Sequence, residues 1–257
     1  MAASRNPGSG SRLAAFVTAF GASRSVYGAL RRRAPGDPAR WQRKNYAGRT
    51  VDLYAGPAAV VGAALGTVPA RTRGAAGIAV VAAGACGAYD DMLGDHRRGF
   101  RAHLGALRQG EVTSGAVKLF GIGAAGLAAG ALLKERPVDK LLAGVVIAGA
   151  AHFVNLVDVA PGRAAVAVLG IGAPGLLRRG SAGALAAAPL GAAAAIVTED
   201  LGERTMLGDT GAHALGAALG TAIVAGNGRA GLALHAAALI AAVAYGDEVS
   251  RIAGSPM

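Results

Sequence analysis

Acidic residues follow apolar segments at three places in this chain, and their types and spacing suit metal-dependent phosphate chemistry. The first is AYDDMLGD, residues 88–95, where the adjacent Asp90 and Asp91 follow an uncharged run over 74–87. Adjacent carboxylates repel each other and lose hydration on burial, so a purely structural role would be costly. Mg²⁺ commonly binds one or two carboxylates together with phosphate oxygens and water. The motif predicts a Mg²⁺ site facing a phosphorylated substrate; a helix cap with solvated charges is the structural alternative.

The second motif is HFVNLVD, residues 152–158. Asn155 and Asp158 are three residues apart, so we expect them on one face at the end of a helix. An amide and a carboxylate together can recognise the donor and acceptor groups of a sugar or a base. The alternative is that Asn155 satisfies helix-terminal carbonyls and Asp158 is interfacial. His152, one turn earlier, is expected to pack between helices rather than to bind a ligand.

The third motif is MLGDTGAHALG, residues 206–216, in which Gly208 and Gly211 flank Asp209 and Thr210 before an apolar helix. Asp209 or Thr210 can cap that helix, and the amide-rich end of a helix also favours anions. Capping alone does not explain the two glycines, which permit close approach on both sides of the acid.

Basic residues accompany the first motif. Arg97 and Arg98 follow the paired acids, and we expect them to contact phosphates or anionic lipid head groups. The net charge of +11 could suggest nucleic acid, but the basic residues flank apolar runs and are not interleaved with aromatics. That arrangement favours a membrane surface as the partner and argues against nucleic acid. The single cysteine, Cys86, excludes an intrachain disulfide.

The elements that must position these motifs are predicted to be membrane helices. Of the residues, 53% are hydrophobic and 16% are charged, against about 25% charged in soluble domains. The 41 glycines suit closely packed membrane helices. A soluble fold would spread its acids over amphipathic faces, which this chain does not do. The apolar runs predict an all-α polytopic membrane protein of about nine helices, with eight to ten fitting the same pattern: 11–30, 54–70, 74–89, 115–133, 141–157, 164–177, 182–197, 210–225 and 230–246.

Alternation of these helices sorts the loops onto two sides of the membrane. We expect one domain over residues 1–257, with a disordered tail over 1–10. One side holds 31–53, 89–114, 155–163, 198–210 and the chain from residue 245, and every acid except Glu135 and Asp139 falls on it. The basic clusters of the first loop predict that this side is cytoplasmic. Topology rules do not explain the segregation of the acids, whereas a cytoplasmic site that uses carboxylates does.

Taken together, DD after one span, N-x-x-D after a later one and LGDTGA opening another resemble the polyprenyl-phosphate N-acetylhexosamine-1-phosphate transferase family. The likeness runs from about Lys44 to Asp247 and includes NYAG and VTSGAVKLFG. It implies Mg²⁺-dependent transfer of a sugar-1-phosphate from a UDP-sugar to a polyprenyl phosphate at the cytoplasmic face of the cell membrane, with release of UMP. It leaves a homodimer open as the form of assembly.

The resemblance also implies roles for particular residues. Asp209 matches the family's Mg²⁺-binding acid, and Asp90 and Asp91 match paired acids near the lipid phosphate and the metal. Lys118 matches a lysine near the start of the following span. Asn155 and Asp158 match the substrate-pocket pair, whose recognition we expect Arg97 and Arg98 to assist.

Three departures from the family pattern point to a short, divergent member. Gly94 stands where one branch of the family, the phospho-MurNAc-pentapeptide translocases, has a lysine. Pro161 stands where a further acid is expected, and a histidine-rich loop is missing. Two other readings stay open. An intramembrane prenyltransferase would use the D-x-x-x-D spacing of DDMLGD, although the later loops offer no clean second copy. A degenerate relative could act as a scaffold or transporter. Asp95, which no part of the resemblance claims, is expected to be a solvated loop acid.

Overall fold

The protein is a bundle of helices with very little sheet. The computed structural model describes residues 7–94, 105–106, 108–111 and 113–254, and it is 79% helical. This confirms the predicted all-α class. The exception is a short antiparallel hairpin of β1 (Gln42–Lys44) and β2 (Thr50–Asp52), preceded by the 3₁₀ turn η1 (Pro38–Trp41).

Every predicted helical segment coincides with a helix of the structure. The helices are α1 (Pro7–Arg32), α2 (Ala55–Gly66), α3 (Arg73–Leu93), α5 (Ser114–Leu133), α6 (Pro137–Leu156), α7 (Arg163–Gly172) with the 3₁₀ turn η2 (Ala173–Leu177), α8 (Gly180–Leu201), α9 (Gly208–Gly226), α10 (Arg229–Ala244) and α11 (Gly246–Gly254). Since α1 begins at Pro7, residues 7–10 of the expected tail are helical, and residues 1–6 lie outside the described part.

Fewer helices than predicted have the length and hydropathy of a membrane span. Within the described residues five qualify, namely α1, α3, α5, α6 and α8, and α10 with α11 makes a sixth if this pair, bent by 80°, is one span. Nine crossings are not shown. Helices α2 and α7 are too short: at a rise of about 1.5 Å per residue, the 12 residues of α2 reach only part of the way across a hydrocarbon core of about 30 Å. Helix α9 has 19 residues, but it carries Asp209 and His213 and is not among the candidate spans. Five or six helices of the described chain are therefore long and apolar enough to span a membrane, which is consistent with a multi-pass membrane protein.

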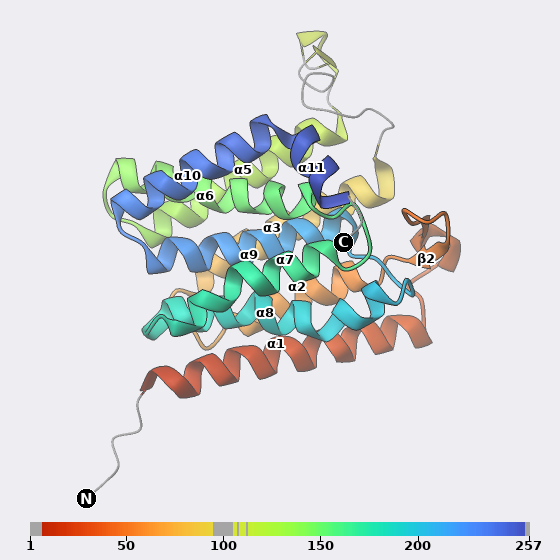
Figure 1. Ribbon diagram of the computed structural model, residues 1–257, viewed down its shortest axis with the longest axis horizontal. Coiled ribbons are helices and arrows are strands. Elements are labelled where there is room, and N and C mark those ends of the chain that lie inside the picture. The colour runs from red at the N-terminus through yellow and green to blue at the C-terminus, as the bar shows by residue number, and fades with distance from the viewer. Residues whose placement is uncertain (1–6, 95–104, 107, 112, 255–257) are drawn as a thin grey trace, which may run out of the picture.

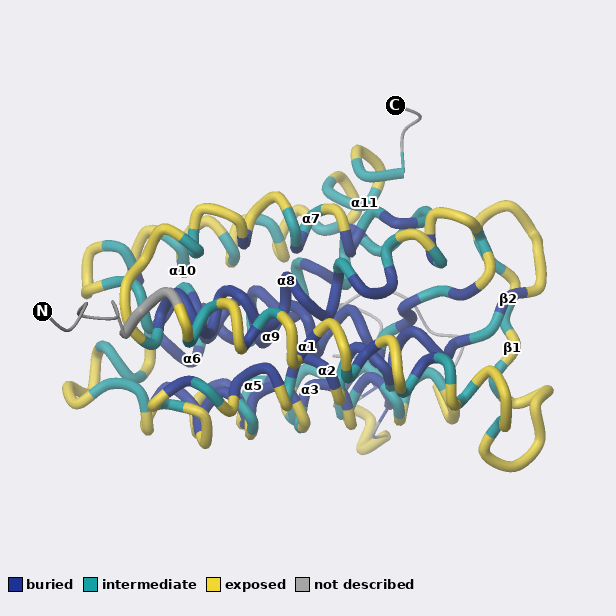
Figure 2. The backbone as a smooth tube through the Cα atoms, turned by 90° about the horizontal axis from the view of Figure 1, so that it is seen from below, coloured by how far each residue is buried: buried dark blue, intermediate teal, exposed yellow. Residues whose placement is uncertain are grey.

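The outer surface of the bundle is apolar, as expected for helices in contact with lipid. Large side chains such as Leu13 of α1, Leu132 of α5 and Leu234 of α10 are each more than 60% exposed, whereas the buried positions are mainly alanine. Figure 2 shows α8 and α9 largely buried at the centre, and exposed turns on α5 and α10 at the periphery. A soluble bundle of this size rarely exposes so much apolar surface.

Helix α9 lies at the centre and packs against α2, α3, α6 and α8, while α1 and α10 lie at opposite edges (Figure 1). Small residues permit the close contact of α9 with α6. A Cβ atom added at Gly216 would lie 2.6 Å from the Cα of Ala151, and one added at Gly220 would lie 2.7 Å from the Cα of Ile147. Such spacing of small residues is typical of membrane helix pairs.

The connections separate onto two ends of the bundle, as the alternation of segments predicts. The loops after α1, α6 and α8 lie at the end that carries β2 and α11, where α3 also ends and α5 begins, and the turns before α3, α6, α8 and α10 lie at the other (Figure 1). We call the first of these the hairpin end. All three acidic motifs lie there.

Candidate functional site at the hairpin end

Three side chains from three helices meet at the hairpin end. The ammonium group of Lys118 on α5 donates to Asp90 Oδ2 of α3 at 2.7 Å and also to Asp209 Oδ2 of α9. Their side chains are 17%, 22% and 24% exposed, respectively, so the cluster is largely buried yet open to solvent. We call Asp90, Lys118 and Asp209 the lysine–aspartate cluster. A cation between two carboxylates neutralises a pair of charges that would otherwise repel.

The start of α5 is built to hold Lys118 in place. Thr113 caps the helix, because its hydroxyl accepts a hydrogen bond from the backbone N–H of Ala116 at 3.2 Å. Ser114, in the first turn, contributes a side-chain hydrogen bond to Asp90. Lys118 follows one turn later on the same face, since residues four apart are neighbours on a helix. Within the segment VTSGAVK, Thr113 is thus the helix cap, Ser114 forms a hydrogen bond with Asp90, and Lys118 is the cation.

Asp91 has a different role from its neighbour, because its side chain caps α9. Its Oδ1 accepts from the backbone N–H of Asp209 at 3.1 Å, and its Oδ2 accepts from the N–H and the hydroxyl of Thr210 at 2.9 and 2.6 Å. These contacts satisfy amide groups that would otherwise lack partners in the first turn of the helix. Asp91 therefore joins α3 to α9 and fixes the position of Asp209.

Close approach of α3 and α9 requires glycine at two positions. A Cβ atom at Gly87 would lie 2.6 Å from the backbone nitrogen of Thr210 and would overlap the carbonyl of Asp209. Gly208 adopts φ +59°, a left-handed conformation that side chains disfavour, and a Cβ atom there would meet the carboxylate of Asp91. The sequence predicted a close approach at the glycines of the third motif, and the structure identifies α3 as the element that approaches Gly208.

The hairpin after α1 closes over this end of the bundle. The guanidinium of Arg43 donates to the backbone carbonyl of Asp91, and the amide of Asn45 donates to Glu203 Oε2 at 2.7 Å. The backbone N–H of Met206 donates to the carbonyl of Asp52 at 2.9 Å. The NYAG segment is consequently tied to the loop between α8 and α9, next to the acids.

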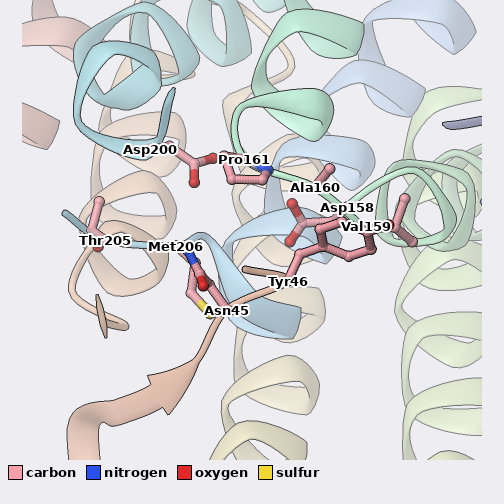
Figure 3. Close-up of a pocket in the computed structure, with 9 residues that line it drawn as sticks. All are labelled: Asn45, Tyr46, Asp158, Val159, Ala160, Pro161, Asp200, Thr205 and Met206. Atoms are coloured by element: carbon pink, nitrogen blue, oxygen red, sulfur yellow. The ribbon is translucent and has the colours of Figure 1, made fainter. Parts of the chain in front are cut away.

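Beside the lysine–aspartate cluster lies a pocket with two further carboxylates. Figure 3 shows Asp158, from the loop after α6, and Asp200, from the last turn of α8, both turned into it. The other lining residues are Asn45, Tyr46, Val159, Ala160, Pro161, Thr205 and Met206. Burial, together with the nearby carboxylate of Asp200, raises the pKa of Asp158 well above its ordinary value of 3.8. Among the described residues, no basic side chain lines the pocket beside these two carboxyl groups.

Asn155 and Asp158 do not share a helical face. Helix α6 ends at Leu156, so Asn155 lies in its last turn, whereas Asp158 lies in the following loop. The backbone N–H of Asp158 donates to the carbonyl of Asn155 at 3.2 Å, which turns the chain away from the helix axis. Asp158 lines the pocket and Asn155 does not.

Two carboxylates of the lysine–aspartate cluster have an arrangement that suits Mg²⁺. Within the described part of the chain, no three acidic, histidine or cysteine side chains form a ready metal cluster. However, Asp90 and Asp209 direct oxygen atoms at one point, now taken by the Lys118 ammonium. Two convergent carboxylates suit Mg²⁺ when a diphosphate and water supply the remaining ligands. Asp91 fits less well, because both of its oxygens already accept hydrogen bonds from α9.

Some predicted residues lie outside the described ranges, and some residues of this region were not predicted. Arg97, Arg98 and Asp95 belong to the first group. Arg43, Asp200 and His213 belong to the second. The Nδ1 atom of His213 lies 2.8 Å from the backbone carbonyl oxygen of Asp209. The four-residue spacing of the two residues, one helical turn, was the feature of the sequence that could have identified His213 as a neighbour of Asp209.

His152 packs its ring edge-on against His213, with ring centroids 5.4 Å apart, in keeping with the packing role predicted for it. For Asp200 the sequence offered no signal, because it lies in an acidic run, TED, typical of a solvated helix end.

Comparison of the chain with protein-family models and with curated proteins gives no match. The site must therefore be interpreted from its own chemistry and from the motif resemblance.

Proposed function

We propose that the protein transfers a sugar-1-phosphate from a UDP-sugar to a polyprenyl phosphate at its hairpin end. One observation carries the proposal. Asp90, Lys118 and Asp209, which match the family's acidic and lysine positions, come from three helices and converge at the end of an apolar bundle. A lipid phosphate held by its tail along the bundle would present its charged group at this level.

The reaction forms one P–O bond and breaks another. An oxygen of the lipid phosphate attacks the sugar-linked phosphorus of the UDP-sugar, and the bond from that phosphorus to the bridging oxygen breaks. UMP leaves with the bonding electron pair. A phosphate monoester is largely ionised near pH 7, so the attacking oxygen needs no strong base. Positioning and neutralisation of charge then provide most of the catalysis.

The residues of the lysine–aspartate cluster can both position the substrates and neutralise their charge. The Lys118 ammonium can move from the carboxylates to a phosphate oxygen, because its chain is flexible and its three N–H groups are all donors. Asp90 and Asp209 would hold Mg²⁺, which when bound supplies positive charge to the diphosphate. Asp91 keeps Asp209 in position through the first turn of α9. Asp158, Asn155, Arg97 and Arg98 remain the proposed substrate contacts.

The proposed orientation places the hairpin end in the cytoplasm, where UDP-sugars are available. The cluster RRR (31–33) covers the last turn of α1 and the residue after it, and RWQRK (40–44) follows in the connection to α2 at this end. Basic residues are enriched in cytoplasmic loops. The donor would then arrive from water, while the polyprenyl phosphate arrives from the membrane.

The test measures UMP release by the purified full-length protein with undecaprenyl phosphate, Mg²⁺ and UDP-GlcNAc, followed by other UDP-sugars. Asp209→Asn and Lys118→Met should each lower the rate by about 100-fold or more, as loss of a group that stabilises transition-state charge does. Asp247→Asn is the matched control, because Asp247 is exposed on α11 at the same end. Absence of UMP release with every UDP-sugar, or full activity in Asp209→Asn, would refute the proposal.

A second candidate function is non-catalytic. The observation in its favour is that the carboxylates already have internal partners: Asp90 and Asp209 pair with Lys118, and Asp91 caps α9. These internal contacts would be sufficient for a degenerate relative that keeps the fold as a scaffold or transporter and binds no metal ion. It predicts no UMP release, together with a loss of stability in Lys118→Met. Release of pyrophosphate from a prenyl diphosphate would instead indicate the prenyltransferase reading.

A further inference from the structure

The carboxylate of Asp200 lacks a partner that its burial demands. Asp200 is only 3% exposed. One of its oxygens accepts from the backbone N–H of Gly162, while Oδ2 is buried and has no hydrogen-bond partner among the described residues. Buried carboxylates are normally paired with cations or hydrogen-bond donors. Since Asp200 lines the pocket, the missing partner can come from a bound ligand (Figure 3).

Three arginines of the described chain that form ion pairs with glutamates in this region do not pair with Asp158 or Asp200. Arg24 and Arg204 both pair with Glu199, at 3.1 and 2.6 Å, and Arg49 pairs with Glu203 at 3.2 Å. Neither Asp158 nor Asp200 forms an ion pair with a described residue. The two glutamates of this region thus have basic partners, whereas the described part of the chain gives the two pocket aspartates none.

The remaining lining favours an organic cation over a metal ion. Both ends of the Asn45 amide are engaged, with Glu203 and with the backbone N–H of Arg49. The Thr205 hydroxyl donates to the Asp52 carbonyl and accepts from the N–H of Ala55. The rest of the lining is apolar or aromatic: Val159, Ala160, Pro161, Met206 and Tyr46. A bound Mg²⁺ usually keeps several waters, and the side chains of Val159, Pro161 and Met206 offer no hydrogen-bond partners to them. An ammonium group has only three N–H donors, which two carboxylates can satisfy.

We infer that this pocket binds the protonated amine of a small organic ligand, with its N–H groups on Asp158 and Asp200 and its carbon skeleton against Met206 and Pro161. The amine could belong to an amino sugar or to a linear polyamine, which share this chemistry. The inference goes beyond the proposed transfer reaction, with which it shares Asp158, because it concerns the binding of an amine alone. It holds or fails whether or not UMP is released.

The test compares free amines with their acetylated, uncharged counterparts by calorimetric titration of the full-length protein in detergent at constant ionic strength. The pairs are glucosamine with N-acetylglucosamine and putrescine with N-acetylated putrescine lacking any free amine. At least one free amine should bind at least 10-fold more tightly than its acetylated counterpart. Asp200→Asn and Asp158→Asn should each weaken that binding by 10-fold or more, whereas Asp247→Asn should leave it unchanged.

Three results would overturn the inference: no free amine binds, the acetylated counterparts bind equally well, or Asp200→Asn binds as the wild type does. MgCl₂ alone is titrated as a further arm. If MgCl₂ gives a heat of binding with the wild type but not with Asp200→Asn, and no amine binds, the pocket is a metal-ion site instead. Melting temperatures of the variants show that they fold, and Asn has the shape of Asp, so loss of binding is separable from loss of structure.

Discussion

The contact between α3 and α9 at Gly87 allows a sharp test of how the site is assembled. In Gly87→Ala, the new methyl group would lie 2.6 Å from the Thr210 nitrogen and overlap the Asp209 carbonyl, whereas ordinary contact begins near 3.4 Å. All of these neighbours are backbone atoms, so no side chain can rotate away. Helix α9 must instead move back by roughly 1 Å, and overpacking of this kind costs about 1–3 kcal/mol. Because the obstacle is backbone, we expect about 3 kcal/mol.

The matched control is Gly77→Ala on the same helix, where an added Cβ atom meets nothing within 4 Å. That change should stabilise the protein by about 0.5–1 kcal/mol, because alanine has the higher helix propensity. The two variants have the same composition, so composition cannot account for a difference between them. Unfolding in mixed micelles with increasing denaturing detergent measures both free energies. If Gly87→Ala is as stable as Gly77→Ala, the close approach of α3 and α9 is wrong.

The same displacement should reach the cluster, since Asp209 follows α9 while Asp90 follows α3. A shift of about 1 Å in a reacting group can reduce a rate by about 100-fold. If the transfer activity exists, Gly87→Ala should lower kcat by about that factor, and Gly77→Ala should not. A stable Gly87→Ala protein with full activity would contradict both parts of the reasoning.

Two further predictions concern the acids around the site. Asp91→Asn should destabilise the protein by about 2 kcal/mol, because one amide oxygen replaces a carboxylate that caps α9 through three donors; a melting temperature equal to that of Asp247→Asn would count against the cap. For Asp158, burial and the facing carboxylate of Asp200, with smaller effects of Asp209 and Asp91, raise the folded-state pKa, so its protonated form stabilises the fold. That stability is fully present below pH 3.8 and is lost as pH rises through the raised pKa. The melting temperature of Asp158→Asn relative to wild type should therefore increase from pH 4 to pH 8, and a constant difference would refute the raised pKa.

The sequence by itself determined the fold class and the end of the bundle at which the acids lie. Apolar runs of nearly the right length mark helices because a chain in lipid must satisfy its backbone hydrogen bonds internally. Alternation of these helices then places Asp90, Asp158 and Asp209 at one end, without any knowledge of packing. Local rules placed the start of α9 to within two residues, since a helix over 210–225 was predicted and α9 begins at Gly208. The predicted cap was wrong, because Asp209 and Thr210 lie inside the helix and Asp91 caps their amide groups.

The tertiary structure decided which acids face each other and which helices are long enough to cross a membrane. Asp90 and Asp91 are adjacent in the sequence, but successive residues on a helix point about 100° apart. One therefore reaches Lys118 and the other caps α9. Asp200 acquired its unpaired oxygen only when α8 and the loop after α6 enclosed it. Spacing along a chain fixes direction within one helix, whereas contacts between helices depend on how small residues let the backbones approach.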